Sequence, residues 1–259
     1  MKILIVNDDG FNAEGIRVLY EAALSRGHQV YVSAPSTQCS AKGQCITLFE
    51  PLLTHTVLER EGLRVVRVDG MPADCVRVAP QVFGTGFDFC ISGINHGENA
   101  GTAVMYSGTV AAAREGAMMH LPSIALSLHH RGNEKGMREA ARIGLDMAEK
   151  LAGADLKRYG VLNINAPAGD PDTWLGHRIC PLSDAYFIDR YVKRTNPFHV
   201  DYLWLDDAQD AKIEKHPAGS DCALLEEGYV TYTFLGGLND YNSSLGALLP
   251  GHVTEHNDA

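Results

Sequence analysis

Short apolar runs alternate with helical patterns over the first two thirds of the chain. Lys2–Asn7 is a run of Ile, Leu and Val, as a strand buried on both faces requires. In Glu14–Arg26 the apolar residues recur at helical spacing, and Gly27 stands where a glycine commonly ends a helix. Further strands are predicted at His28–Ala34, Leu63–Val68, Phe87–Ser92, Ile124–Leu128 and Gly160–Ile164, and further helices at Ala73–Val78, Thr109–Met119 and Glu134–Leu151.

The rhythm of strand, helix and strand predicts βαβ units, and therefore an α/β fold with a mostly parallel sheet. The chain has no internal repeat and no low-complexity linker, so we expect a single domain over residues 1–259. Within it, residues 1–167 are expected to form a self-sufficient core that carries the chemistry. Residues 168–259 are expected to form an extension used in assembly.

The extension differs from the core in its pattern. Tyr186–Leu205 is aromatic and charged without a clean period, Gly228–Leu235 alternates like an antiparallel strand whose edge needs a partner, and Gly251–Ala259 is expected to fray. Aromatic residues interleaved with charges are typical of an interface, so we expect a homo-oligomer; alternatively, the aromatics cover the chain's own sheet. The residues concerned are Tyr186, Phe187, Tyr191, Phe198, Tyr202, Trp204, Tyr229, Tyr232 and Phe234, with Asp189, Arg190, Lys193 and Arg194 between them.

Composition and charge narrow the choice of partners. Hydrophobic residues are 45% of the chain, enough for a sizeable core, and the net charge of −10 argues against a nucleic-acid polymer. No stretch approaches the roughly 18 apolar residues of a membrane span, and the first residues do not resemble a signal peptide. The six cysteines form no CxxC pair and are interpreted as reduced thiols. We therefore expect a cytoplasmic protein without a membrane partner.

The first predicted strand ends on two adjacent carboxylates, Asp8 and Asp9, followed by Gly10. Ligand sites of open α/β sheets lie beyond the carboxyl ends of the strands. A divalent cation such as Mg²⁺ or Mn²⁺ would justify two carboxylates that otherwise repel each other. The alternative is that the pair only serves a turn, since Asp-Gly is common turn chemistry.

Two further segments favour a site. Ser92–Gly101 follows another strand and places Asn95 and Asn99 among glycines, where amide oxygens can bind a hard cation. Tyr106–Gly116 opens a predicted helix whose first free N–H groups can bind phosphate. The alternatives are a tight connection in the first segment and ordinary helix capping by Ser107 in the second.

Other polar residues near the strand ends are less specific. The loop Ser33–Gly43 offers the hydroxyl of Ser40 and the charge of Lys42 at the same sheet edge. His96 in the glycine-rich loop could be an acid or a ligand, but it could equally be an exposed residue without a catalytic role. The pair His129 and His130 follows the strand Ile124–Leu128 and could contact a substrate.

Several long motifs, in order along most of the chain, resemble those of the SurE family of metal-dependent phosphatases that act on nucleoside monophosphates. Chance is a poor explanation for so many motifs in the same order. The motifs are NDDG at Asn7–Gly10, Ala34-Pro35 followed by Ser40 and Ile46-Thr47, Gly70–Cys75, Ser92–Gly101, Tyr106–Gly116, Leu162–Pro167 and Asp221–Thr231.

The resemblance implies a fold and a set of site residues. The fold is a Rossmann-like, mostly parallel three-layer sandwich with a C-terminal hairpin and helix extension, which is exchanged between subunits in dimers or tetramers. The implied ligands of one divalent cation per subunit are Asp8, Asp9, Ser40 and Asn95. The implied phosphate-binding residues are Asn99, Ser107, Gly108 and Thr109.

The implied reaction is hydrolysis of nucleoside 5'-monophosphates, with 3'-monophosphates as a further candidate class, assisted by the cation. Asp8 or Asp9 would be the general base, and the alternative is that one of them is a nucleophile. A rival of another class is a metal-dependent nucleotide-binding protein without turnover. A dinucleotide-binding Rossmann protein is excluded because no G-x-G-x-x-G follows the first strand.

The chain departs from the family pattern in one loop. The family's Asp-Arg pair is replaced by Ser36-Thr37, and the glycine that follows the ligand serine is replaced by Ala41. The first change removes one charge of each sign from the loop, so it bears on the range of substrates. The resemblance is loose around Tyr191–Leu205.

Overall fold

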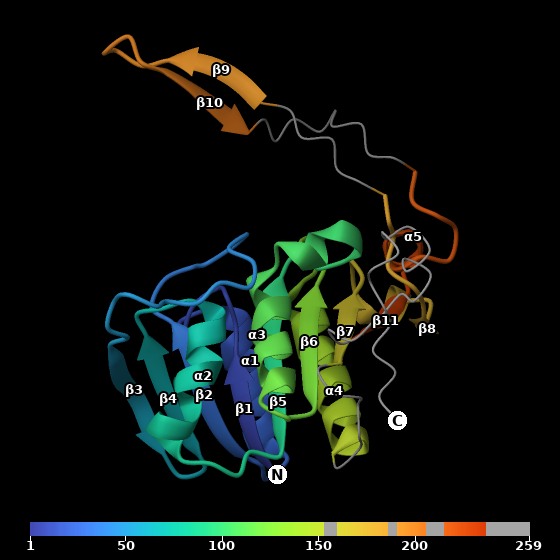
Figure 1. Ribbon diagram of the computed structural model, residues 1–259. Coiled ribbons are helices and arrows are strands. Elements are labelled where there is room, and N and C mark those ends of the chain that lie inside the picture. The colour runs from blue at the N-terminus through green and yellow to red at the C-terminus, as the bar shows by residue number, and fades with distance from the viewer. Residues whose placement is uncertain (153–159, 186–190, 206–214, 237–259) are drawn as a thin grey trace, which may run out of the picture.

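The computed structural model describes residues 1–152, 160–185, 191–205 and 215–236 of the chain. They form an α/β sandwich whose central sheet has helices on both faces (Figure 1). The nine strands of the sheet are, in spatial order, β3 (Thr54–Arg60), β4 (Leu63–Val68), β2 (Gln29–Pro35), β1 (Lys2–Val6), β5 (Phe89–His96), β6 (Ser123–Leu128), β7 (Val161–Ala166), β11 (Val230–Leu235) and β8 (His177–Ile179).

The middle of the sheet is parallel, from β4 through β2, β1, β5 and β6 to β7. The edge strand β3 is antiparallel to β4, and β11 is antiparallel to β7. The chain builds outward from β1 in one direction through β2 and β4, and then from β5 in the other through β6 and β7. The point at which the direction reverses therefore lies between β1 and β5, where α/β sheets bind their ligands.

The helices pack in two layers because alternate residues of each strand face opposite ways. Ile3 and Ile5 of β1 share a buried cluster with α1 and α4, whereas Leu4 and Val6 share one with α2 and α3. Both faces of the central strands are therefore buried, which explains their uninterrupted apolar sequences. The helices are α1 (Glu14–Ser25), α2 (Pro72–Phe83), α3 (Gly108–Met118), α4 (Glu134–Leu151) and α5 (Asp221–Glu227), with the short 3₁₀ helices η1 (Gly101–Met105) and η2 (Pro171–Thr173).

The predicted α/β fold is confirmed, and every strand and helix predicted for the core is present. Two of them extend further than predicted, because α2 continues to Phe83 and β5 to His96. The residue pattern missed five elements, namely the strands β3 and β8, the helix α5 and the short 3₁₀ helices η1 and η2. Both missed strands are exposed at every position, so they show neither an apolar run nor a buried alternating face.

Gly228–Leu235 is the antiparallel strand that was expected to need a partner at its edge, and its partners come from the same chain. Its strand, β11, pairs with β7 on one side and with β8 on the other, all within one chain. Tyr232 lies between these two neighbours and is half-buried. This strand therefore closes the chain's own sheet and gives no argument for a second subunit.

The predicted hairpin in the extension is confirmed. β9 (Tyr191–Thr195) and β10 (Asp201–Leu205) form a separate two-stranded antiparallel sheet. Figure 1 shows it standing away from the central sheet, and Phe198 and Trp204 are 85% and 64% exposed. These aromatics do not cover the chain's own sheet. Tyr186, Phe187, Asp189, Arg190 and the tail Gly251–Ala259 lie outside the described residues.

Two further expectations concern the cysteines and the absence of a membrane-spanning helix. All six cysteines are free, and burial raises the pKa of the Cys90 thiol to about 12, as expected of a packing residue. Within the described residues, every helix is too short or too polar to cross a membrane.

Candidate functional site

A hollow of about 220 Å³ opens at the carboxyl ends of β1 and β5. Its position is the reversal point of the sheet, where the topology predicts a ligand site. The loops that follow β1 and β2, the end of β5 and the start of α3 all contribute to it. The residues that line it are Asp8, Asp9, Gln38, Ser40, Ala41, Asn95, His96, Asn99, Ala103, Tyr106 and Ser107.

Asp8 is the more rigidly held of the two carboxylates. It is 4% exposed, and its Oδ1 accepts a hydrogen bond of 2.6 Å from the hydroxyl of Thr109. The side chain lies against Gly108, where an added Cβ would be 2.7 Å from the Asp8 Cβ. Asp8 is therefore fixed at the first turn of α3, and Gly108 is the residue type that permits this approach.

Asp9 is held more loosely. Its oxygens accept long hydrogen bonds, 3.4 Å from the backbone N–H of His96 and 3.5 Å from the amide of Gln38. Burial raises the pKa of the Asp9 carboxyl, and the adjacent charge of Asp8 raises it further. Two neighbouring carboxylates with so few hydrogen bonds to Asp9 fit a divalent cation. Its charge would offset both the cost of burying the carboxylates and their mutual repulsion.

The two neutral ligands implied by the family resemblance line the same hollow. The Asn95 amide nitrogen donates to the carbonyl of Gly97 at 2.7 Å, so its oxygen Oδ1 remains available as a ligand. The hydroxyl of Ser40 accepts from Gln38 at 2.9 Å. Two carboxylates, an amide oxygen and a hydroxyl form the all-oxygen set that suits Mg²⁺ or Mn²⁺.

Ala41 occupies the position where the family pattern has a glycine. Its φ is +57°, which is the left-handed region that favours glycine. At this alanine the loop therefore has a backbone conformation that a glycine would adopt without strain. The departure at this position therefore adds backbone strain to the loop.

The start of α3 combines capping with free N–H groups. The Ser107 hydroxyl accepts from the backbone N–H of Val110 at 3.0 Å, so ordinary capping by Ser107 is confirmed. The N–H groups of Gly108 and Thr109 belong to the first turn, where no helical carbonyl can accept them. The Thr109 hydroxyl serves Asp8, so only its backbone N–H remains for a phosphate.

Asn99 is held by a network that sequence reasoning missed. Its carbonyl accepts from the amides of Asn163 (2.7 Å) and Asn165 (3.2 Å), and its N–H donates to the Asn165 Oδ1 at 2.8 Å. Its side-chain amide donates to the hydroxyl of Ser127 at 2.9 Å. The two asparagines of β7 therefore position the glycine-rich loop, and their alternate spacing on one strand is the signal that could have indicated this role.

Two other motif carboxylates have structural roles. Asp221 is fully buried and accepts hydrogen bonds from the N–H groups of Gly101 (2.8 Å) and Ser183 (2.7 Å), which ties α5 to the start of η1. Asp74 accepts from Thr47 and from the backbone of Met71 at the start of α2. These motifs are therefore explained by packing of loops around the site.

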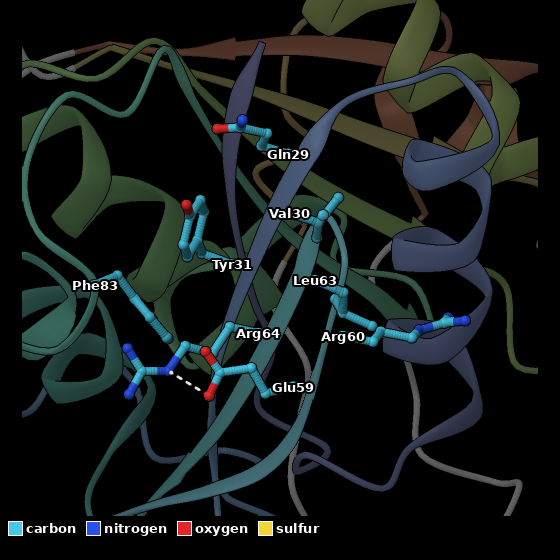
Figure 2. A pocket seen from close by; sticks show the side chains of 9 residues that line it. Gln29, Val30, Tyr31, Glu59, Arg60, Leu63, Arg64 and Phe83 are labelled. Carbon is cyan, nitrogen blue, oxygen red and sulfur yellow. Dashed lines mark ion pairs between the residues drawn. The ribbon is translucent and has the colours of Figure 1, made fainter.

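A second hollow, of about 300 Å³, lies at the opposite end of the strands, where β2 and β4 begin (Figure 2). It is built on the first residues of β2 and β4, such as Gln29 and Leu63, so it faces away from the strand ends that carry Asp8. Its charged residues include Arg64 and Glu59, whose nearest side-chain atoms are 3.8 Å apart. None of the predicted site residues lines it.

The histidines take different positions. His96 lines the first hollow and is exposed. His129 and His130 lie outside that lining and instead face Glu98. The structure thus brings together seven of the eight predicted site residues as lining or immediate neighbours of one hollow, and Thr109 contributes through its bond to Asp8.

The fold and the hollow define a class of protein, an α/β protein with an oxygen-rich acidic site beside a helix N-terminus at the reversal point of a parallel sheet. Comparisons identify the family. The family model described as survival protein SurE matches residues 3–189. A protein of Desulfovibrio desulfuricans named 5'-nucleotidase SurE is 38% identical over 239 residues, 90% of this chain and 91% of that one. The chain belongs to the SurE family.

Two further similarities agree with this assignment. A protein of Clostridium botulinum, also named 5'-nucleotidase SurE, is 37% identical and covers 90% of this chain and 92% of its own. The crystal structure of the SurE protein from Aquifex aeolicus matches with a TM-score of 0.78 and 30% identity, covering 96% of this chain and 98% of that one. The Rossmann-like sandwich with its C-terminal extension is thereby confirmed.

The partly buried Asp9, which accepts only long hydrogen bonds, leads to a prediction about the stability of the fold. A carboxyl whose pKa is raised by folding destabilises the fold when it is ionised. The destabilisation is complete at a pH above the raised pKa, and it is absent at a pH below the ordinary value of 3.8. At pH 7 and without a divalent cation, Asp9→Asn should therefore raise the Tm, by on the order of 1–2 °C. Thermal unfolding in EDTA measures this.

With saturating Mg²⁺ the difference should disappear or reverse, because the cation stabilises the wild-type protein that binds it better. An unchanged or lower Tm of Asp9→Asn in EDTA at pH 7 would contradict the account of Asp9. Repeating the scan about one pH unit below the ordinary value of 3.8, where the carboxyl is largely protonated in both states, is the internal control.

Proposed function

We propose that the protein is a 5'-nucleotidase, a metal-dependent phosphomonoesterase that hydrolyses nucleoside 5'-monophosphates to nucleoside and phosphate. The names of the two curated relatives support the activity. The observation that carries the proposal is the convergence of Asp8, Asp9, Ser40 and Asn95 on one hollow beside the start of α3. Activity on 3'-monophosphates is part of the proposal, and the same experiment tests it.

The cation site is proposed at Asp8, Asp9, Ser40 and Asn95. When bound there, a Mg²⁺ or Mn²⁺ ion would neutralise charge on the phosphoryl oxygens of the substrate. The protein's own contribution is to hold the oxygen ligands in place, through Thr109 for Asp8 and through Gly97 for Asn95. These two ligands are therefore preformed.

The phosphate is proposed to bind at the first turn of α3. The free N–H groups of Gly108 and Thr109 and the positive end of the helix favour an anion there. Asn99 supplies an amide to the same hollow. A hydroxyl both donates and accepts, so Ser127 can hold this amide in either orientation, and the rotated amide would donate to a phosphoryl oxygen.

The proton of the attacking water is proposed to pass to one of the two aspartates. Asp9 is the better candidate because its hydrogen bonds are long, whereas Asp8 Oδ1 is engaged with Thr109. The alternative is that an aspartate attacks phosphorus directly and forms an aspartyl-phosphate. Mass spectrometry after acid trapping with substrate distinguishes the two, since only the second leaves a phosphate on the protein.

The test of the function is a panel of nucleoside 5'- and 3'-monophosphates, assayed for phosphate release with Mg²⁺, with Mn²⁺ and with EDTA. We expect release from 5'-monophosphates with either cation and none in EDTA. Binding of nucleotides without release would favour the alternative, a metal-dependent nucleotide-binding protein. Release that is unaffected by EDTA would refute the proposed role of the cation.

We infer that the protein is a homodimer or homotetramer assembled through the β9–β10 hairpin. An isolated two-stranded hairpin is at best marginally stable in water, and this one exposes Phe198, Leu203 and Trp204. A second copy of the chain would bury these side chains.

The six free cysteines fit a reducing compartment, so we also infer that the protein acts in the cytoplasm.

Deletion of residues 191–205 should convert the oligomer to a monomer of slightly below 28.1 kDa, as measured by light scattering at micromolar concentration. The hairpin pairs only with itself among the described strands, so the central sheet should survive its removal. A truncation after residue 167 is a worse test, because it removes β11 from its place beside β7. A wild-type protein that is already monomeric would refute the inference.

A further inference from the structure

A cluster of three metal-ligating side chains lies outside the proposed reaction site. Glu98, in the glycine-rich loop, faces His129 and His130, which follow β6. One ligand atom from each of the three residues lies within 4.8 Å of the other two. None of the three lines the hollow that contains Asp8, so the proposed reaction leaves them without a role.

The main chain around this cluster is anchored. The N–H of Gly97 donates to the carbonyl of Leu128 at 2.8 Å, which fixes the loop that carries Glu98 against the end of β6. The N–H of His129 donates to the carbonyl of Ala166 at 2.9 Å. The residue that follows Glu98 is held by the asparagine network of β7. The three side chains therefore start from backbone positions that are set by the sheet.

The distances between ligand atoms are close to those that an ion requires. The Nε2 of His129 is 3.6 Å from one oxygen of Glu98, and the Nδ1 of His130 is 3.1 Å from the other. Two ligands of a tetrahedral zinc ion are about 3.3 Å apart, given bonds of about 2.0 Å. The two imidazole rings stack at 4.2 Å, so they must splay for both nitrogens to point at one ion. The half-exposed His130 is free to do so.

The protonation states also suit a cation. Burial lowers the pKa of His129, which keeps its imidazole neutral near pH 7, the form that binds metals. Burial opposes ionisation of Glu98, but hydrogen bonds from its own backbone and from His130 outweigh it, so the pKa of this carboxyl is lowered. The backbone N–H of Arg131 donates to the His129 Nδ1. Binding an ion at Nε2 would move the ring proton to Nδ1, and the N–H of Arg131, an exposed residue, would then bond to water.

We propose that Glu98, His129 and His130 form a second cation site, with a fourth position open to water. Two imidazoles and one carboxylate select borderline ions such as Zn²⁺, Ni²⁺ or Co²⁺ over the hard Mg²⁺ and Ca²⁺. The site is separate from the oxygen site at Asp8. An ion bound there would join the glycine-rich loop to the end of β6.

The experiment titrates Co²⁺ into the full-length protein with excess Mg²⁺ present, and follows the visible absorption of the bound ion. Zn²⁺ is titrated in parallel against a chromophoric chelator. Wild type and Asp8→Asn should both bind one Co²⁺ per chain at this site, which separates it from the proposed reaction site. His130→Ala and Glu98→Gln should each weaken binding by more than about tenfold, and the double variant His129→Ala/His130→Ala should lose it. The exposed His55→Ala is the matched control and should bind as wild type does.

Equal stoichiometry and affinity in the wild type and the double variant would overturn the proposal. Strong near-ultraviolet absorption from sulfur ligation, retained in the double variant, would assign the ion to a cysteine and would overturn it as well. Because His130 has a side chain that is 53% exposed, its replacement should leave the fold intact, and circular dichroism of each variant checks this. A Tm that rises with Zn²⁺ in the wild type but not in His130→Ala would support the site independently.

Discussion

Asp8→Asn should abolish nearly all phosphate release while leaving the fold intact. The substitution removes one of only two anionic ligands from the proposed cation site. Loss of a residue that merely supports a metal ligand commonly costs ~10–100-fold, so loss of a charged ligand should cost more than about a hundredfold in kcat/KM. The amide oxygen of the new side chain can still accept the hydrogen bond from Thr109, so the packing of α3 should be preserved. Steady-state kinetics with Mg²⁺ and the Tm in EDTA measure the two effects.

Two variants make this experiment specific. Asp172→Asn removes an exposed carboxylate that does not line the hollow, and it should leave kcat/KM unchanged. Thr109→Val keeps the shape of the side chain but removes its hydrogen bond to Asp8, so it should reduce kcat/KM by an intermediate amount, on the order of 10–100-fold. If Asp8→Asn retained near-wild-type kcat/KM at low Mg²⁺, the assignment of the cation site would be wrong.

The parallel core could be predicted from the sequence because burial on two faces leaves a strong local signal. The run from Ile3 to Val6 is apolar at every position, and in the structure each of these residues is fully buried. β3 carries no such signal, since THTVLER is exposed throughout and is a strand only because β4 offers a free edge. β11 shows the opposite case: its alternation was recognised, but its neighbour β8 was not, and the partner was therefore sought in another subunit.

The site was predictable where its residues follow strands. Asp8 and Asn95 come from β1 and β5, which are neighbours at the reversal point, so the topology alone brings them together. Hydrogen-bond partners that lie far apart in the sequence leave no signal in the local residue pattern. Thr109 was assigned to the phosphate, and only the structure shows that its hydroxyl holds Asp8. In the same way, Asn163 and Asn165 hold the backbone of Asn99, which lies far from them in sequence.

Gly108→Ala should impair the site with little effect on stability. The added Cβ would lie 2.7 Å from the Asp8 Cβ and 2.8 Å from its Oδ2, closer than real Cβ contacts, so either the carboxylate or the first turn of α3 must shift. A displacement of up to about 1 Å in a reacting group can cost about a hundredfold in rate. Alanine is a better helix former than glycine, which offsets part of the strain. We therefore expect a large fall in kcat/KM and weaker Mg²⁺ binding with a Tm change of only a few degrees.

Gly136→Ala is the matched control, because Gly136 also lies in the first turn of a helix. There the added Cβ would meet the end of the Leu128 side chain at 3.3 Å, and this flexible group can move aside. We expect kcat/KM and Mg²⁺ affinity of this variant to equal those of the wild type. If Gly108→Ala lowered the Tm strongly but left kcat/KM per folded molecule unchanged, the contact with Asp8 would matter only for packing. If it lost activity and kept its Mg²⁺ affinity, the glycine would act through the phosphate-binding N–H groups of α3 rather than through the cation ligand.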